Sequence, residues 1–466
     1  MSTKRKFCAC SKHECGRKFP LWAVCFVILF AGFAVNLPDK LSSQGVKNFD
    51  SWSNDIMISD LMYLQHYGLD TALQKSIAPP DLQQVYGTEI DASRLQIQVF
   101  EEGKTFPKEI FKKYDSNVTI QRFLYAFLDR VLPVNNATLL LVLKGLNCAL
   151  LAGMAAAVVC WLGSITHPVF SPVAAVILAA LCPNFTMYRT NLYWFGGSLF
   201  VPMVVSILLV RSKVFQTAAP KKQFTLLASA AFLSCLFKQL VYFEFVSTVM
   251  VAMTIPVFYW LFAEQKSVRE GLRAGVRCIG AQVAGAAGSF VVAVAIRFAL
   301  QIKDYGWQRA MEISTENFML RILGNAQTQS ESILESYEAG YLEVLGKMFR
   351  ATCFALGDYA LSFGQLTGAV ALLAVLYLVV RTWKKPQTPS RTWNAHLMIT
   401  CLSLLAPLSW FVLAKPHTYV HGRHCTFVWF VPFVIVAVVF SMETIVRLLK
   451  TVCASHPEKA ALSVEG

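Results

Sequence analysis

Acidic side chains stand in a polar stretch shortly after the first apolar segment of the chain. Asp50, Asp55 and Asp60 recur every five residues there. A carboxylate held at the edge of a membrane can act as the general base that deprotonates an acceptor hydroxyl. The same group can bind a divalent cation or cap the start of a helix, and Asp55 is well placed as a cap. We therefore take Asp55, and next Asp60, as candidate catalytic residues, with metal binding and capping left open.

Basic and imidazole side chains crowd a short connection before the last apolar segment. Lys415, His417, His421, Arg423 and His424 lie within ten residues of one another. A phosphate group needs hydrogen-bond donors and positive charge, and an arginine can bind it with two parallel hydrogen bonds. This connection is therefore the best candidate anion site in the chain. The three histidines can alternatively bind a metal ion, and a solvated basic turn is the simplest alternative.

Two further charged positions lie inside or beside apolar segments. Glu244 and Lys238 interrupt an apolar stretch of about forty residues, and ionisable residues within membrane segments usually serve a function or pair with each other. A purely structural Lys–Glu pair is equally compatible with the sequence. Arg189 lies near the end of another apolar segment, where it can join a phosphate site or extend its charged end towards water.

The composition excludes a water-soluble globular protein. The chain has 466 residues, of which 55% are hydrophobic and 15% charged, against about a quarter charged in typical soluble domains. A bilayer core about 30 Å thick needs roughly 20 apolar residues per helix. On that scale the sequence predicts an all-α polytopic membrane protein with about ten transmembrane helices. They are expected near 20–37, 138–163, 170–187, 192–210, 224–240, 243–262, 278–300, 361–380, 396–414 and 425–446. The segment 224–240 is short enough to be a re-entrant hairpin instead.

The net charge of +14 is explained by topology rather than by a nucleic-acid partner. The short segments 1–19, 211–223, 263–277, 381–395 and 447–466 carry 21 Lys and Arg against five Glu, and ten spans place all of them on one face. The positive-inside rule makes that face cytoplasmic and puts both termini there. The predicted organisation follows the chain as a cytoplasmic tail (1–19), a first transmembrane helix (20–37), a periplasmic loop (38–137), transmembrane helices two to seven (138–300), a second periplasmic loop (301–360), helices eight to ten (361–446) and a cytoplasmic tail (447–466).

The first long loop is predicted to contain an amphipathic helix over residues 120–131. Its apolar residues recur at helical spacing: Ile120, Phe123, Leu124, Phe127, Leu128 and Val131. Such a helix can lie in the outer membrane interface, with its apolar face in the lipid. Alternatively, the apolar face covers a small core of the loop itself.

Three short stretches of the chain resemble motifs of bacterial membrane glycosyltransferases of the GT-C superfamily. Residues 53–55 (Ser-Asn-Asp), followed by Asp60, are similar to the Asn-Asp-Asp-type motif just outside their first transmembrane helix. Residues 242–248 are similar to a Tyr-Phe-Asp-Phe-Leu-Thr-Thr segment of bacterial proteins of this type. The run 415–424 resembles a His-Ser-Tyr-x-His run before the last span of the same group.

The resemblance implies a GT-C-like fold with large outer loops carrying interfacial helices. It implies that a sugar is transferred from a polyprenyl-phosphate donor by inverting displacement, with an Asp as general base. Where relatives carry two adjacent acids, this chain has Asn54-Asp55. The expected site comprises the catalytic Asp55 and Asp60, the supporting Glu244 and, around the donor phosphate, His417, His421, Arg423, Lys415, Lys238 and Arg189.

The same resemblance implies the partners and the location of the protein. The donor would enter sideways from the bilayer of the bacterial inner membrane, and the active site would face the periplasm. The acceptor would be a cell-envelope glycan, a lipid or a protein such as a pilin. No cofactor and no metal ligands are assigned, and a divalent cation is left open. A transporter or flippase of lipid-linked sugars is the alternative function, and it predicts a symmetry between halves that the sequence does not show.

Overall fold

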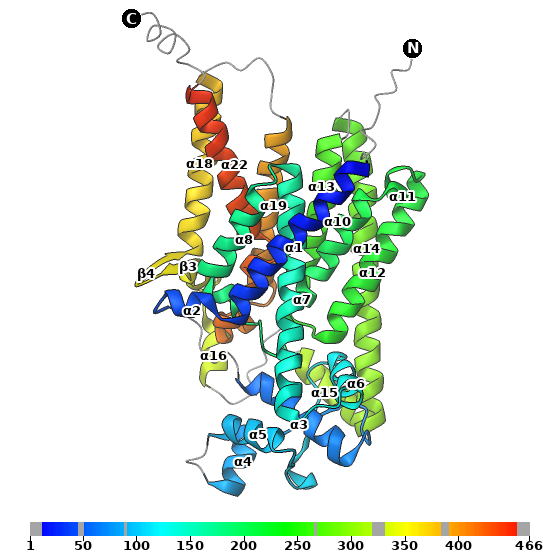
Figure 1. The fold of residues 1–466 in the computed structure, drawn as a ribbon. Coiled ribbons are helices and arrows are strands. Elements are labelled where there is room, and N and C mark those ends of the chain that lie inside the picture. The colour runs from blue at the N-terminus through cyan, green and yellow to red at the C-terminus, as the bar shows by residue number, and fades with distance from the viewer. Residues whose placement is uncertain are drawn as a thin grey trace, which may run out of the picture.

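The computed structural model describes residues 12–44, 51–87, 91–264, 268–318, 331–383 and 391–453. Within these ranges the chain consists of α-helices and two antiparallel sheets of two short strands each (Figure 1). The predicted all-α class is confirmed, and the apolar helices are those of a membrane-embedded protein. Asp50 and parts of both predicted tails, residues 1–11 and 454–466, lie outside the described ranges.

Every apolar segment expected to cross the membrane contains a helix. Six regions are long and apolar enough to span by themselves, and they lie in α7 (Asn136–Ile165), α12 (Pro220–Val241), α13 (Val246–Glu264), α14 (Val268–Tyr305), α18 (Phe363–Trp383) and α19 (Arg391–Leu413). A seventh is a bent pair that joins α21 (Gly422–Cys425) and η4 (Thr426–Phe430) to α22 (Phe433–Cys453). The other three apolar helices are shorter and belong to α1 (Lys12–Ala34), α8 (Phe170–Leu181) and the pair η2 (Gly196–Phe200) and α10 (Val201–Arg211).

The division between the fifth and sixth predicted spans is confirmed by a break between α12 and α13. α12 is one continuous helix of 22 residues, which at 1.5 Å per residue is long enough to cross a bilayer core, so it is not a re-entrant hairpin. The chain leaves the helix at Tyr242, whose backbone is extended, and Phe245 has a positive φ of 64°. The break therefore contains Glu244 in backbone that is not helical.

The two ends of the helical bundle differ in character (Figure 1). α1 begins and α22 ends at the same end of the bundle, where α11 (Lys213–Gln216) also lies. The described helices and strands of the segments 38–137 and 301–360 lie mainly towards the opposite end.

The described parts of the long segments form short helices and strands. The first contains α2 (Leu37–Leu41), α3 (Ser51–Tyr67), β1 (Gln74–Ser76), α4 (Pro79–Tyr86), α5 (Ala92–Glu101), η1 (Lys108–Ile110), β2 (Lys112–Tyr114) and α6 (Gln121–Val131). β1 pairs with β2, with Gln74 opposite Tyr114, and α3 is buried against α5, β1 and α6. The second contains α15 (Trp307–Phe318), α16 (Glu331–Glu338), α17 (Tyr341–Arg350), β3 (Thr352–Leu356) and β4 (Tyr359–Ser362). The short helices α9 (Pro183–Thr186) and α20 (Lys415–Val420) complete this end.

The amphipathic helix α6 is oriented with its polar side inwards. Arg122 and Tyr125 are 1% and 0% exposed, whereas Phe123 and Phe127 are 49% and 59% exposed. The buried side is held by hydrogen bonds, because the Tyr125 hydroxyl donates to the Leu192 carbonyl over 3.1 Å. Phe123, Leu124, Phe127 and Val131 of the predicted apolar face are exposed, whereas Ile120 and Leu128 pack against the hydrophobic core. Most of the apolar face therefore does not cover a core of the loop.

We expect Tyr125→Ala and Phe127→Ala, two residues apart on α6, to differ sharply in stability. Loss of the buried Tyr125 ring leaves a cavity and should lower the free energy of unfolding by about 3–5 kcal/mol. Phe127→Ala removes an exposed side chain and should cost about 0.5 kcal/mol or less in detergent. Denaturant-induced unfolding in a mild detergent measures both. Equal costs would contradict the orientation of this helix.

Candidate functional site

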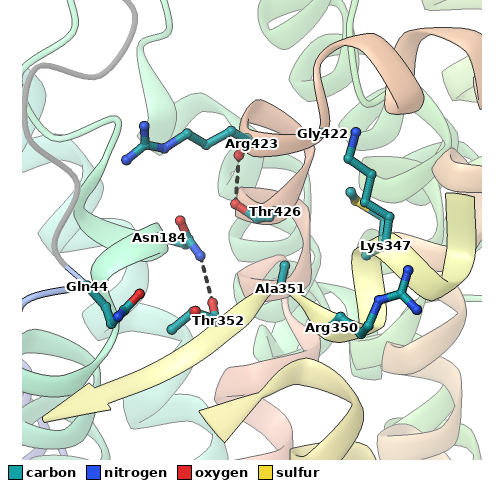
Figure 2. A pocket seen from close by; sticks show the side chains of 10 residues that line it. Gln44, Asn184, Lys347, Arg350, Ala351, Thr352, Gly422, Arg423 and Thr426 are labelled. Carbon is teal, nitrogen blue, oxygen red and sulfur yellow. Dashed lines mark hydrogen bonds between the residues drawn. The ribbon is translucent and has the colours of Figure 1, made fainter. Parts of the chain in front are cut away.

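A basic cavity lies where α9, α17, β3 and α21 meet (Figure 2). Its volume is about 420 Å³. Three cationic side chains line it, together with polar groups and small or apolar residues: Lys347, Arg350, Arg423, Gln44, Asn184, Thr352, Thr426, Met348, Ala351 and Gly422. No acidic side chain of the described residues is among them. The lining therefore favours an anion.

Each cation is placed by a short helix at the end of the bundle. Lys347 and Arg350 are three residues apart on α17, so both lie on neighbouring parts of one helix surface. Arg423 belongs to α21, which is joined to η4 by a hydrogen bond from the Thr426 hydroxyl to the Arg423 carbonyl over 2.7 Å. Figure 2 shows Arg423 on one side of the cavity and the two α17 cations on the other.

Gly422 of α21 lies in close contact with side chains of α17. A Cβ atom at Gly422 would lie 3.1 Å from Met348 Cε and 3.3 Å from Lys347 Cε, so α17 approaches α21 closely because no side chain intervenes. On the opposite side, the Asn184 amide donates a 2.6 Å hydrogen bond to the carbonyl of Thr352, which joins α9 to β3. The elements that line the cavity are therefore joined by contacts between lining residues.

No acid of the described residues pairs with the positive charges in the cavity. Within the described ranges, none of Lys347, Arg350 and Arg423 forms an ion pair with a carboxylate. The Lys347 ammonium donates to the Tyr419 backbone carbonyl over 3.1 Å and lies 4.7 Å from the centre of the Tyr419 ring. Cations held together without counter-charges in a hollow attract anionic ligands, and arginines favour phosphate or carboxylate groups.

Of the residues predicted to bind phosphate, Arg423 lines this cavity and its histidine neighbours lie beside it. The rings of His417 and His421 are 4.8 Å apart, and those of His421 and His424 are 5.6 Å apart. Neither His417 nor His421 is part of the lining. Lys415 points elsewhere, because its ammonium donates to the carbonyls of Tyr337 and Ala339 over 2.9 and 2.7 Å and so caps the end of α16.

Lys238, Glu244 and Arg189 lie outside the cavity lining. Lys238 is 1% exposed, and its ammonium donates to the backbone carbonyls of Tyr242 and Glu244. This lysine therefore holds the break between α12 and α13. The Glu244 carboxylate accepts a 3.4 Å hydrogen bond from the Asn117 amide of the first long segment. Arg189 donates to the Thr186 carbonyl over 3.2 Å.

The two predicted catalytic acids are buried in α3, apart from the cavity lining. Asp55 is fully buried and accepts a hydrogen bond from the Ser93 hydroxyl. Asp60 is also fully buried, lies 2.8 Å from Arg122 Nε and accepts a 2.8 Å hydrogen bond from the Lys75 backbone amide. Burial raises the pKa of Asp60 to about 6, although the Arg122 charge opposes this change. The geometry gives Asp60 a structural contact and leaves the role of Asp55 a prediction.

Sequence reasoning missed two cations and one acid near the cavity. Lys347 and Arg350 lie in the segment 301–360, and their only signal was a Lys-x-x-Arg spacing at the end of a strongly amphipathic helix. Asp39 of α2 lies near enough to Arg189 to interact with its charge. α2 packs against α9 and β3, two elements that line the cavity, so Asp39 belongs to an element that borders them.

The described residues contain no group of three or more His, Cys, Asp or Glu side chains arranged to hold a metal ion. The comparisons with other proteins add no assignment to the site. No protein-family model, no curated protein and no solved structure matches this chain.

The buried Asp60–Arg122 pair predicts a pH-dependent stability. The unfolded carboxyl titrates near 3.8 and the folded one near 6, so folding takes up a proton between these values. The free energy of unfolding should therefore fall by about 3 kcal/mol as pH rises from 3.8 to about 6. Above about pH 6 this group should cause no further change.

The double variant Asp60→Leu/Arg122→Met should lose that part of the pH profile. Arg122→Met alone leaves an unpaired buried carboxylate and should cost about 3–5 kcal/mol near neutral pH. Unfolding measured across pH for the wild type, both single variants and the double variant forms the test. A profile that is the same in the double variant and the wild type would refute the assignment.

Proposed function

We propose that this protein is a membrane glycosyltransferase that uses a polyprenyl-phosphate-linked sugar as its donor, and that the basic cavity holds the donor phosphate. The observation that carries the proposal is that Lys347, Arg350 and Arg423, without described counter-charges, line one cavity of a helical bundle. A lipid-linked phosphate needs such a site next to apolar helices. The resemblance to GT-C enzymes supports transfer of the attached sugar.

In the proposed reaction, an acceptor hydroxyl attacks the anomeric carbon of the sugar while the bond from that carbon to the phosphate oxygen breaks. The base takes the hydroxyl proton, and the electron pair of the broken bond stays on the lipid phosphate. Arginine and lysine side chains around the phosphate stabilise the charge that develops on it. His417 and His421, beside Arg423, supply further donors at the edge of the site.

Asp55 is the proposed base, and Asp60 is the second candidate. Because Asp55 is covered in this structure, the proposal requires the layer around α3 to open before the acceptor reaches the carboxylate. Asp60 is better suited to position α3, since it already binds Arg122. We propose that Lys238 and Arg189 support the site from the adjoining segments and that Glu244 supports it through Asn117.

The finer topology is also a proposal. Ten spans in a GT-C-like arrangement account for six long helices, one bent pair and three shorter apolar helices. The basic end would face the bacterial cytoplasm with both termini, and the cavity would face the periplasm. α6 would lie in the outer interface, which is supported by its outward apolar face. The acceptor would be an envelope glycan, a lipid or a protein such as a pilin.

Arg423→Gln and Lys347→Gln should each weaken binding of a long-chain polyprenyl phosphate by about tenfold or more, because each removes a charge-assisted hydrogen bond. Arg309→Gln, an exposed cation of α15 outside the cavity, is the matched control and should leave binding unchanged. Binding of the radiolabelled lipid to the full chain in nanodiscs measures the effect. Unchanged binding in both cavity variants would overturn the proposed phosphate site.

Asp55→Asn should lower sugar transfer by about 10²- to 10⁴-fold while leaving polyprenyl-phosphate binding intact, because only proton removal is lost. Asp91→Asn is the control, since asparagine caps a helix about as well as aspartate and Asp91 caps α5. Glycan product is measured in a host with the intact pathway, at equal membrane abundance. Retained product would remove Asp55 as the base, and lipid translocation without product would favour a flippase.

A further inference from the structure

The hairpin of β3 and β4 presents apolar side chains that no other part of the described chain covers. Leu356, Tyr359 and Leu361 are 55%, 86% and 53% exposed. β3 pairs with β4 in antiparallel register, with Leu356 opposite Tyr359 at the turn. Figure 1 shows the hairpin projecting from the side of the bundle near α2 and α8. A projecting apolar surface of this kind marks a site of interaction with lipid or a ligand.

Strand β3 of the hairpin begins at the basic cavity. Ala351 and Thr352, at the root of β3, line the cavity, and Figure 2 shows the strand running away from it. The Asn184 amide holds the Thr352 carbonyl, so the root is fixed to α9. An extended ligand with its anionic group beside Arg350 would therefore have the root of the hairpin next to it.

The turn of the hairpin is fixed to the segment after α2. The Gly357 amide donates to the Leu41 carbonyl over 2.7 Å, and the Ser42 hydroxyl donates to the Gly357 carbonyl over 2.9 Å. Gln44, two residues further on, lines the cavity. The root and the turn are thus both anchored to elements that border the cavity, which keeps the exposed face in a defined position.

The hairpin is continuous with a helix surface suited to lipid. β4 ends at Ser362 and α18 begins at the next residue. α18 is a candidate membrane span, and Leu372 and Val375 on it are 59% and 55% exposed. An apolar strand that leads without a linker into such a helix belongs at the edge of the bilayer.

We infer that the exposed face of the β3–β4 hairpin binds the hydrocarbon tail of a lipid whose phosphate occupies the basic cavity. This inference rests on the proposed function and assigns the path by which the donor reaches the site. Charge and hydropathy match the two parts of one amphiphile, because cations line the cavity and apolar side chains line the strand beside it. The occupant is the tail of the phosphate lipid, not bulk phospholipid.

The test compares two phosphates that share a head group and differ in tail. A long-chain polyprenyl phosphate and a short, water-soluble prenyl phosphate are bound to the full chain in nanodiscs. In the double variant Leu356→Gln/Tyr359→Gln, affinity for the long lipid should fall about tenfold or more, because tail burial is lost. Affinity for the short phosphate should change by less than about twofold. Leu233→Gln/Val291→Gln, on exposed faces of α12 and α14, is the matched control.

The outcomes separate the inference from the function on which it rests. If Arg423→Gln weakens binding of both phosphates and the hairpin variant weakens binding of neither, the cavity remains the proposed phosphate site. The hairpin is then not the binding site of the tail, and the inference is overturned. If the hairpin variant weakens binding of both phosphates equally, the hairpin only supports the wall of the cavity. The inference is then overturned. If Arg423→Gln changes neither ligand, the proposed function and the inference fail together.

A crosslinking arm separates the donor tail from bulk lipid. A benzophenone amino acid replaces Tyr359, and the protein is irradiated with radiolabelled polyprenyl phosphate. We expect excess unlabelled polyprenyl phosphate to abolish the crosslinking. Excess phospholipid should leave the crosslinking unchanged. Equal competition by phospholipid would show that the hairpin contacts bulk lipid only.

Discussion

A break in a membrane helix leaves backbone groups without partners, and here the first long segment supplies them. Where α12 ends, the Asn117 side chain accepts a 2.9 Å hydrogen bond from the Phe243 amide, and the Ile120 amide donates to the Leu240 carbonyl over 3.0 Å. Unpaired backbone groups are costly in a membrane, so this contact is required for the break to persist. Because Ile120 directly precedes α6, the same contact sets where α6 begins and, through Arg122, where α3 lies.

The charged groups described above fall into two kinds with different physical roles. Asp60 and Arg122 are buried and form an ion pair with each other, which makes them part of the framework. Lys347, Arg350 and Arg423 border an open space and are not paired with described acids. Paired charges hold elements together, whereas unpaired cations in a cavity are available to a ligand. This distinction depends on the surroundings of each residue rather than on its type.

The sequence predicted the helices well because hydrophobic length and helical periodicity are local properties. The break near Glu244 was also predicted, because charged residues interrupt the apolar stretch there, although Lys238 itself lies within α12. The site was predicted only in part. Arg423 was identified, but Lys347 and Arg350 meet it through packing of α17 on α21, which no local pattern reveals. Asp55 reads as an exposed acid in a polar run, and only the fold shows that α5 covers it.

Gly422 brings two walls of the cavity into contact without a side chain of its own. A Cβ atom there would lie 3.1 Å from Met348 Cε and 3.3 Å from Lys347 Cε, so the ends of these two α17 side chains would have to shift to admit it. Both side chains line the cavity, as Gly422 does. A substitution at this uncharged position would therefore change the shape of the cavity wall without removing a charged group.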